Sequence, residues 1–421
     1  MNTRLRSWAP WLGGALVLVL SGCSGGSDQP QEHAVDAASL VKLSTAAGQT
    51  VDPSTPLTVT AVKGTLTDVT IRGADGRQVA GKLAPDGRSW HSTGTLAAGA
   101  AYQAQISADD GSGGRGTVTE QFHTKAAAHL LTATFTPQQG GSYGVGEPIT
   151  VTLSQPVKDP AARAVVERGL VVRSSPSVTG AWYWVDDTTL HFRPQGYWPA
   201  HATVQAAFQL QGVKVQGDTY GGALSATAFT TRDKWYALTD ARSDYMTVYR
   251  NDKVVRRIPV TTGKPGFSTR NGIKVVLEQQ STVFMDSRTV GIAAGSSNSY
   301  ALNVRWASRV TWSGEYVHAA PWSVGSQGVA NVSHGCTGMS TENARWFYDT
   351  FRPGDLVEVV HSLGHEMERF GNGYGDWNVS WADWEKGSAL HRTVTTGAPV
   401  NGVGGTADTT ATAVGYLRPS V

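Results

Sequence analysis

The stretch "EPITVTLSQPV" (147–157) decides the fold class, because apolar and polar residues alternate along it. Alternation with period two predicts a β-strand that buries one face. A similar stretch, "PLTVTAVKG" (56–64), lies earlier in the chain, and "AYQAQISA" (101–108) alternates in the same way. Gly, Pro and Asp separate these short segments. The pattern therefore predicts a mainly β protein.

The two similar stretches lie in two blocks that close on related sequences, "FHTK" (122–125) and "FTTR" (229–232). Each block has the length and the many short strands of a β-sandwich. We therefore predict tandem sandwiches over residues 41–127 and 128–232, acting as rigid spacers. Neither block contains a cysteine, so the disulfide of antibody domains is absent. The aromatic-rich "LHFRPQGYWP" (190–199) favours core packing over glycan binding.

The third region, residues 233–362, is also predicted to be rich in β-strands. Within it, "YMTVYRNDKVVRRIPVTTG" (245–263) predicts a hairpin that turns at Asn251-Asp252. The segment "TENARWFYDTFRPGD" (341–355) predicts a helix capped by Thr341, and the apolar run "LVEVV" that follows predicts a strand.

A short Trp-rich subdomain is predicted over residues 363–390. Its segment "GDWNVSWADWEKG" (375–387) places Ser380 as a helix cap, with Trp381 and Trp384 at helical spacing. This spacing favours packing of the two indoles onto the neighbouring domain over ligand binding. The Thr/Gly/Ala-rich tail, residues 391–421, is predicted to be disordered.

The N-terminus has the pattern of an export signal. Arg4 and Arg6 precede an apolar run that is too short to span a bilayer, and small residues follow it. The quartet Leu20-Ser21-Gly22-Cys23 resembles the lipobox of bacterial lipoproteins. That resemblance implies a signal peptide over 1–22, lipid on Cys23, and a protein anchored in the cell membrane on its extracytoplasmic face. Residues 23–40, small and polar, are predicted to be a flexible linker.

The overall composition narrows the possible partners. The 421 residues carry a formal net charge of +2, and only 16% of them are charged. Because no Lys/Arg-rich run appears, the sequence gives no support for nucleic-acid binding.

Cys336 is the second of two cysteines, and a lipid on Cys23 would leave it without a disulfide partner. It lies in "SHGC" (333–336), after His318 in "GEYVHAAPW". A nearby histidine can serve as the base that makes a thiolate, and the backbone N–H groups of Gly335 and Cys336 can form an anion-binding nest. The predicted helix after the motif can also lower the thiol pKa. Spacing alone leaves open a buried structural cysteine beside a core histidine.

The run "HAAPWSVGSQGVANVSHGC" resembles the catalytic domain of L,D-transpeptidases of the YkuD type. The stretches "FMDSRTVG" (284–291) and "YALNVRWASRVTWSGEYVHAAPWSVG" (300–325) are similar as well. The whole pattern resembles mycobacterial L,D-transpeptidases with two immunoglobulin-like domains. The resemblance implies two immunoglobulin-like sandwiches, a β-rich YkuD-type catalytic domain with one or two helices, and a short C-terminal subdomain.

The resemblance also assigns roles to individual residues. It implies Cys336 as the nucleophile, His318 as the general base and acid, and His334 as a residue that shapes the site. In relatives a serine carbonyl after the base histidine orients the imidazole, and Ala319 takes that position here. Backbone N–H groups at Gly335 and Cys336, with the hydroxyl of the lid residue Tyr300, are expected to bind the oxyanion. Substrate contacts are expected from the following residues: Met285, Tyr300, Trp322, Ser333 and Gly338.

Gly338 departs from the family pattern, because many members have Asn two residues after the cysteine. The difference concerns donor affinity or acceptor preference, since the nucleophile and the base remain. The pair of histidines in "HSLGHE" (361–366) lacks the helical context of a metal motif, and we expect neither a metal nor another cofactor.

The expected activity is formation of 3→3 peptidoglycan cross-links through a cysteine thioester. The expected partners are the peptidoglycan stem peptides, as donor and acceptor, and the membrane through the lipid on Cys23; we expect a monomer. Two alternatives stay open. Water as the acceptor would make the protein an L,D-carboxypeptidase, and a degenerate site would make it a non-catalytic lipoprotein that binds the cell wall.

Overall fold

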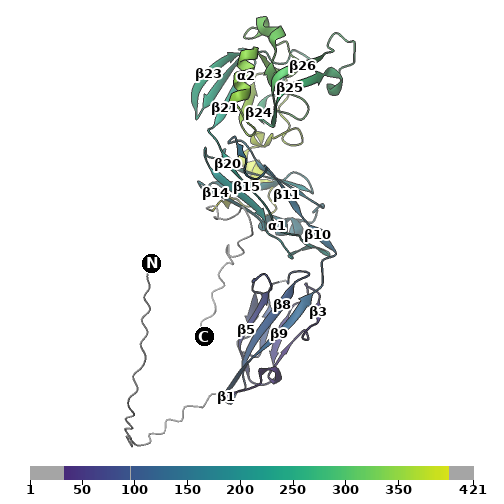
Figure 1. Cartoon of the computed structure of the whole chain (residues 1–421), viewed down its shortest axis with the longest axis vertical. Helices are drawn as coiled ribbons and strands as arrows, with labels where there is room; N and C mark the ends of the chain where they lie inside the picture. Colours follow the sequence, from purple (N-terminus) through teal and green to yellow (C-terminus); the bar gives the residue numbers. More distant parts are fainter. Residues whose placement is uncertain (1–32, 95, 398–421) are drawn as a thin grey trace, which may run out of the picture.

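The computed structural model describes residues 33–94 and 96–397. Cys23 and the predicted signal peptide therefore lie outside the described residues. Two β-sandwiches and a β-rich third region follow one another along the long axis of the molecule (Figure 1). Within the described ranges, no helix has the length and apolar character needed to cross a membrane.

The first sandwich packs a sheet of order β1-β9-β8-β5, with β3 also on β9, against a sheet of order β2-β4-β7-β6. The strands are β1 His33–Ala34, β2 Val41–Leu43, β3 Thr50–Val51, β4 Thr58–Ala61, β5 Thr65–Gly73, β6 Gly81–Leu83, β7 Ser89–Ser92, β8 Ala101–Asp109 and β9 Gly114–Thr124. Inward-facing residues from both sheets, such as Ile71 and Phe122, form its buried core.

The second sandwich packs a sheet of order β11-β13-β16-β15-β30 against one of order β12-β20-β17-β14. Its elements are β10 His129–Leu131, β11 Ala133–Thr136, β12 Ser142–Tyr143, β13 Ile149–Leu153, α1 Pro160–Gly169, β14 Leu170–Ser175, β15 Thr179–Trp184, β16 Thr189–Pro194, β17 Thr203–Phe208, β18 Lys214–Gln216, β19 Thr219–Gly221, β20 Ser225–Thr231 and β30 Val394–Thr395. The three short strands β10, β19 and β18 form a separate small sheet.

The two similar stretches of sequence occupy equivalent places. In the first sandwich β4 lies between β2 and β7, and in the second β13 lies between β11 and β16, with antiparallel pairing on both sides. Both strands are central and bury alternate residues, which explains their similar alternation. The predicted mainly β class is confirmed.

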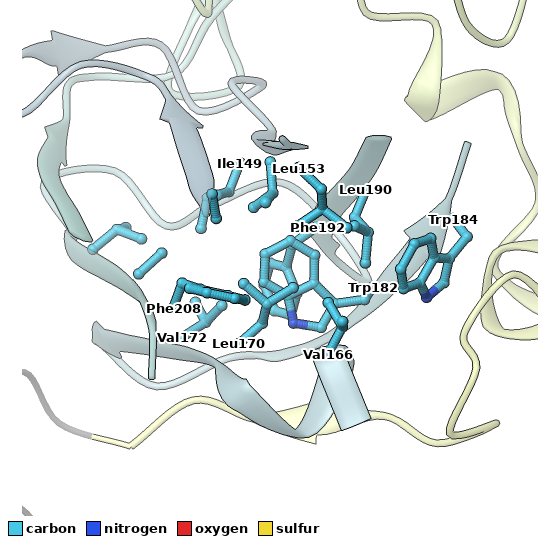
Figure 2. Packing of buried hydrophobic residues seen from close by; sticks show 14 of the residues in the cluster. Ile149, Leu153, Val166, Leu170, Val172, Trp182, Trp184, Leu190, Phe192 and Phe208 are labelled. Carbon is cyan, nitrogen blue, oxygen red and sulfur yellow. The ribbon is translucent and has the colours of Figure 1, made fainter. Parts of the chain in front are cut away.

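The core of the second sandwich is built from large apolar side chains of both sheets. Figure 2 shows Trp182 and Phe192 packed with Phe208, and the rings of Trp182 and Phe192 lie 5.2 Å apart edge to face. Leu190, Phe192 and Trp198 are buried, so core packing of the aromatic-rich stretch 190–199 is confirmed. Helix α1 was not predicted; it begins after Asp159, whose side chain accepts a hydrogen bond from the N–H of Ala162.

The third region has two sheets, of order β23-β22-β21-β29-β24 and β25-β26-β27-β28. Its elements are β21 Trp235–Asp240, β22 Tyr245–Arg250, β23 Lys253–Pro259, β24 Gly272–Val275, β25 Glu278–Asp286, η2 Ser287–Val290, β26 Ala301–Arg309, β27 Tyr316–Ala319, η3 Pro321–Ser326, β28 Thr337–Met339, α2 Thr341–Thr350 and β29 Leu356–Val360. The hairpin at Asn251-Asp252 and the strand of "LVEVV" are confirmed. The cap of α2 is Ser340, not Thr341, because the Ser340 side chain accepts from the N–H of Asn343.

The C-terminal segment joins the third region to the second sandwich. It contains η4 Asp376–Asn378 and α3 Trp381–Lys386, which Ser380 caps as predicted. The indole N–H of Trp384 donates to the carbonyl of Ala181 at 2.9 Å, and Trp384 is fully buried, so its expected packing onto the neighbouring domain is confirmed. A buried His191–Asp376 pair, 2.6 Å apart, adds a further link.

The predicted flexible linker and the predicted disordered tail both contain regular structure in part of their range. In the predicted linker 23–40, β1 pairs with β9 and a 3-10 helix, η1, spans Ala37–Ser39. In the predicted disordered tail 391–421, β30 extends the sheet beside β15, and Thr396 is buried against Ser174. The remainder of that tail, residues 398–421, lies outside the described residues. Edge strands supply the partners that fix these polar segments, and local composition does not reveal such partners.

Candidate active site

The parallel pair β27–β28 places the cysteine and the first histidine on one face of a sheet. The register places His318 opposite Gly338, with Cys336 directly before β28. Residues two apart on a strand share a face, so Cys336 lies on the face of Gly338 and therefore on the face of His318. Gly338 also bridges Thr261 through two backbone hydrogen bonds of 2.9 Å, which fixes β28 from its other side.

Cys336 is a free, half-buried cysteine whose thiol donates to the carbonyl of Gly314 at 3.6 Å. Burial raises the pKa of the Cys336 thiol to about 12; the N–H of Tyr316 lowers it, and the negative charge of Glu315 raises it further. At neutral pH the sulfur is therefore a neutral thiol. It needs a base before it can act as a nucleophile.

His318 is well placed to be that base. It is 5% exposed, and its Nδ1 lies 2.8 Å from the carbonyl oxygen of Ala319. A carbonyl only accepts, so Nδ1 carries the proton and Nε2 is left as the acceptor. Burial lowers the pKa of His318, although the Ala319 carbonyl opposes that shift. The imidazole is thus neutral and able to take a proton, and Ala319 makes the orienting contact expected of its position.

His334 and Tyr300 lie on another side of the motif. The ring of His334 is 4.8 Å from that of Phe267 and 5.1 Å from that of Tyr300. Burial lowers the pKa of His334, and the charge of Lys264 lowers it further. Burial also raises the pKa of Tyr300, and negative charge on Cys336 would raise that pKa further. The expected contact of Tyr300 with an oxyanion stays a prediction.

The turn at Gly335 is held by hydroxyl groups. Ser333 Oγ donates to the carbonyl of Cys336 at 2.6 Å, and Thr269 Oγ1 donates to the carbonyl of Gly335 at 2.9 Å. Gly335 has φ +120°, which favours glycine. Its N–H donates to Ser333 Oγ at 3.2 Å, so this predicted oxyanion donor has a protein partner here. Ser333 stabilises the turn, and its predicted contact with substrate stays a prediction.

The remaining predicted substrate contacts differ in their surroundings. Trp322, in η3, is 58% exposed, and its ring lies 6.1 Å from that of His318, so it is available to a substrate beside the base. Met285, in β25, packs in the same apolar cluster as Cys336. Gly338 is enclosed: a Cβ there would lie 3.0 Å from the Cβ of Ala320 and 3.2 Å from Cγ2 of Thr261.

The histidines of "HSLGHE" lie apart from the site, each with its own carboxylate. His361 Nδ1 is 2.9 Å from Asp240, and His365 Nε2 is 3.3 Å from Glu368. In residues 33–94 and 96–397, no cluster of three or more His, Cys, Asp or Glu side chains has the geometry of a metal site.

Sequence reasoning missed the charged cluster behind the thiol. Glu315 is adjacent to two residues that touch the sulfur, and it pairs with Arg270 at 3.0 Å and with Lys274 at 3.2 Å. Arg270 pairs in turn with Glu368 at 2.8 Å. The cluster joins three separate stretches of the sequence, at 270–274, 315 and 368, and only the position of Glu315 beside "YVHAAPW" gave a signal.

Two family descriptions match this chain. Residues 48–214 match a bacterial Ig domain, and residues 234–359 match the L,D-transpeptidase catalytic domain. The Ig match extends across parts of both sandwiches.

Individual relatives are similar over most of the chain. The chain is 38% identical over 344 residues to L,D-transpeptidase 2 of Mycobacterium tuberculosis, which covers 82% of this chain and 83% of that protein. It is 41% identical to L,D-transpeptidase 1 of the same species over 54% of this chain and 84% of that protein. A solved structure of L,D-transpeptidase LdtMt1 with imipenem has 38% identity and a TM-score of 0.47, and the match covers 55% of this chain and 99% of that one.

Proposed function

Because this chain belongs to the L,D-transpeptidase family, we propose that it forms 3→3 cross-links between peptidoglycan stem peptides through a thioester on Cys336. One observation carries the proposal: the β27–β28 register places Cys336 and His318 on one face, and the Ala319 carbonyl holds the imidazole with Nε2 free to accept. This is the arrangement that cysteine acyl transfer needs.

The first half-reaction makes the acyl-enzyme. His318 takes the thiol proton, and the sulfur attacks the carbonyl of the third residue of a tetrapeptide stem. The resulting oxyanion is stabilised by the N–H of Cys336 and the hydroxyl of Tyr300. The N–H of Gly335 can also donate to it while keeping part of its hydrogen bond to Ser333 Oγ. His318 then returns the proton to the departing amine of D-Ala, which leaves a thioester.

The second half-reaction transfers the acyl group. The side-chain amine of a diamino acid in a neighbouring stem attacks the thioester, while His318 removes its proton. Collapse of the tetrahedral adduct regenerates the thiol and leaves an amide bond between two third residues. The neutral state of His318, which burial favours, suits it to this role as a base.

The acceptor is tested by product analysis. The full chain is incubated with a purified disaccharide-tetrapeptide, and the products are separated and weighed. A dimer with a 3→3 bond, formed together with free D-Ala, supports the proposal. Trimmed tripeptide without any dimer would show an L,D-carboxypeptidase instead. Recovery of unchanged donor, with no adduct on Cys336, would favour a wall-binding lipoprotein.

We also propose that lipid on Cys23 anchors the protein in the cell membrane, facing the wall. The lipobox-like quartet before Cys23 supports this proposal, as does the elongated arrangement of the sandwiches (Figure 1). The sandwiches would then hold the catalytic region away from the bilayer. Fractionation of cells that express the Cys23→Ser variant tests it: the variant should leave the membrane fraction, and retention there would contradict the anchor.

A further inference from the structure

The charged cluster behind Cys336 is buried, although the acyl-transfer chemistry does not use it. Lys274 is fully buried and Glu315 is 6% exposed. Burying such charges costs several kcal/mol unless they are paired and hydrogen-bonded. Here they are paired: Glu315 Oε2 lies 3.2 Å from Lys274 Nζ, and Glu315 Oε1 accepts from both the backbone N–H and Nη1 of Arg270 at 3.0 Å.

Glu315 lies between the two residues that contact the sulfur. The carbonyl of Gly314 accepts from the thiol, and the N–H of Tyr316 faces the same atom. The backbone of Glu315 is fixed as well, since its N–H donates to Thr311 Oγ1 at 2.8 Å and its carbonyl accepts from Val310 at 2.9 Å. These backbone hydrogen bonds and the ion pairs of the side chain together hold Glu315 between the two groups that contact the thiol.

Glu315 is surrounded by charged side chains from two parts of the chain. Arg270 and Lys274 face it from the chain at and before β24, and beyond Arg270 lies Glu368, which His365 and Asn372 also contact. The two carboxylates offset the two cations. Glu315 is the carboxylate whose negative charge acts on Cys336, and it opposes a second negative charge on the sulfur.

We propose that Glu315, held by Arg270 and Lys274, is a positioning residue that directs the resting Cys336 thiol at the Gly314 carbonyl and adds to the effect of burial in keeping it protonated until substrate binds. The proposal rests on the proposed function, because it assigns Cys336 as the nucleophile. When substrate arrives, the S–H bond breaks as an N–H bond forms at His318 Nε2, and the thiol leaves its contact with Gly314. A protonated resting sulfur reacts slowly with other electrophiles and with oxidants.

The test measures alkylation of Cys336 by iodoacetamide between pH 6 and 10 in the full chain. Peptide mass mapping follows the adduct on Cys336 separately from Cys23. Glu315→Gln keeps an oxygen for the hydrogen bonds of Arg270 but removes the charge. Because the thiolate fraction changes about tenfold per unit of pKa, we expect its alkylation at pH 8 to rise roughly threefold to tenfold.

Glu368→Gln is the matched control. It removes a carboxylate that pairs with the same arginine, Arg270, but Glu368 is not adjacent to Gly314 or Tyr316. Its alkylation profile should follow that of the unmodified sequence. An unchanged profile for Glu315→Gln, or an equal shift in Glu368→Gln, would overturn the proposal. If Glu315→Gln does not fold, the pair Glu315→Gln with Lys274→Met leaves no unpaired buried charge. Its rise should be smaller, because the loss of the Lys274 cation offsets part of the effect, and no rise at all would overturn the proposal.

Alkylation needs no stem peptide, so this experiment is independent of the cross-linking assay. A chain that fails to cross-link can still show the Glu315 effect, and a chain that cross-links can lack it. The two failures are therefore distinguishable.

Discussion

In the second sandwich, β15 and β16 bury Trp182 and Phe192 between two sheets (Figure 2). In the third region, by contrast, β27 and the residues around β28 place a buried imidazole and a half-buried thiol on one face of a sheet. Burial itself stabilises the aromatic pair. Burial of the polar groups opposes folding unless hydrogen bonds and ion pairs offset it. The contacts in the second sandwich therefore stabilise the fold. The contacts around β27 and β28 hold polar side chains in defined positions.

The largest effect on activity is expected at Cys336, in the third region, with little effect on stability. Cys336→Ala should lower transpeptidase turnover at least about 10⁴-fold, because no other group supplies the nucleophile. Its unfolding midpoint in denaturant should stay close to that of the unmodified chain, since the thiol makes one weak hydrogen bond of 3.6 Å. Steady-state rates with a muropeptide donor, together with urea unfolding, measure both. Turnover by Cys336→Ala at a rate similar to that of the unmodified chain would show that another residue is the nucleophile.

His318 is expected to give the next largest effect. His318→Gln keeps a polar side chain of similar reach but cannot accept and return the proton, so acylation of Cys336 by a carbapenem should slow about 10²–10⁴-fold. Intact-mass spectrometry over time follows the adduct. The control is His365→Gln, whose histidine contacts Glu368 away from the thiol. Equal rates in His318→Gln and the unmodified chain would remove His318 from the mechanism.

The sandwich side of the comparison is tested at Phe192. This residue is fully buried, so Phe192→Ala should cost about 3–5 kcal/mol of unfolding free energy through lost transfer energy and a cavity. The carbapenem acylation rate of the folded protein should not change. Denaturant unfolding and the same mass assay report the two quantities. A slower acylation without loss of stability would show that the sandwich core acts on the site.

Gly338 belongs both to the candidate site and to a tightly packed interior. It lies opposite His318, and it is enclosed like a core residue. A Cβ there would be 3.0 Å from Ala320 and 3.2 Å from Thr261, so Gly338→Ala should destabilise the fold by about 1–3 kcal/mol. Adding Ala320→Gly should restore part of that loss in a double-mutant cycle. No loss in the single variant would mean that β28 moves readily.

The smallest expected effect is the dependence of stability on pH. Because burial lowers the pKa of His318 in the folded state, the unfolded histidine takes up a proton first, near its ordinary value of 6.5. This contribution to stability is present above that pH and is lost as the pH falls below it. Urea unfolding at pH 7.5 and pH 5.5 should show a smaller drop in the free energy of unfolding for His318→Gln than for the unmodified chain. Equal drops would show that His318 is not the source of the pH dependence.

Local patterns predicted several strands, among them β4, β8, β13 and β29, and the hairpin at Asn251-Asp252. Alternation along β13 and β4 was informative because one face of each is buried. Helix α1 had a usable signal that was not recognised, Asp159 as cap followed by Pro160. At α2 two neighbouring hydroxyls compete for the cap, and only the backbone geometry selects Ser340 over Thr341.

Long-range contacts set the limit of sequence reasoning. Strand β30 exists because the edge of β15 accepts it, and nothing in its Thr- and Gly-rich surroundings indicates that partner. The position of Cys336 and His318 followed from the motif and its spacing. The pairing of Glu315 with Lys274 did not, because it depends on how β24 and the turn before β27 meet in space. Sequence patterns thus pointed to the proposed reacting groups but not to the charges that surround them.

The most direct test of thioester chemistry at Cys336 is the mass of the intact protein during turnover with a tetrapeptide-stem donor alone. We expect a transient adduct with the mass of the donor minus D-Ala, located on Cys336 by peptide mapping. The adduct should be absent in Cys336→Ala and should form more slowly in His318→Gln. D-Ala release with no adduct on Cys336 at any time, or an adduct on another residue, would exclude Cys336 as the nucleophile.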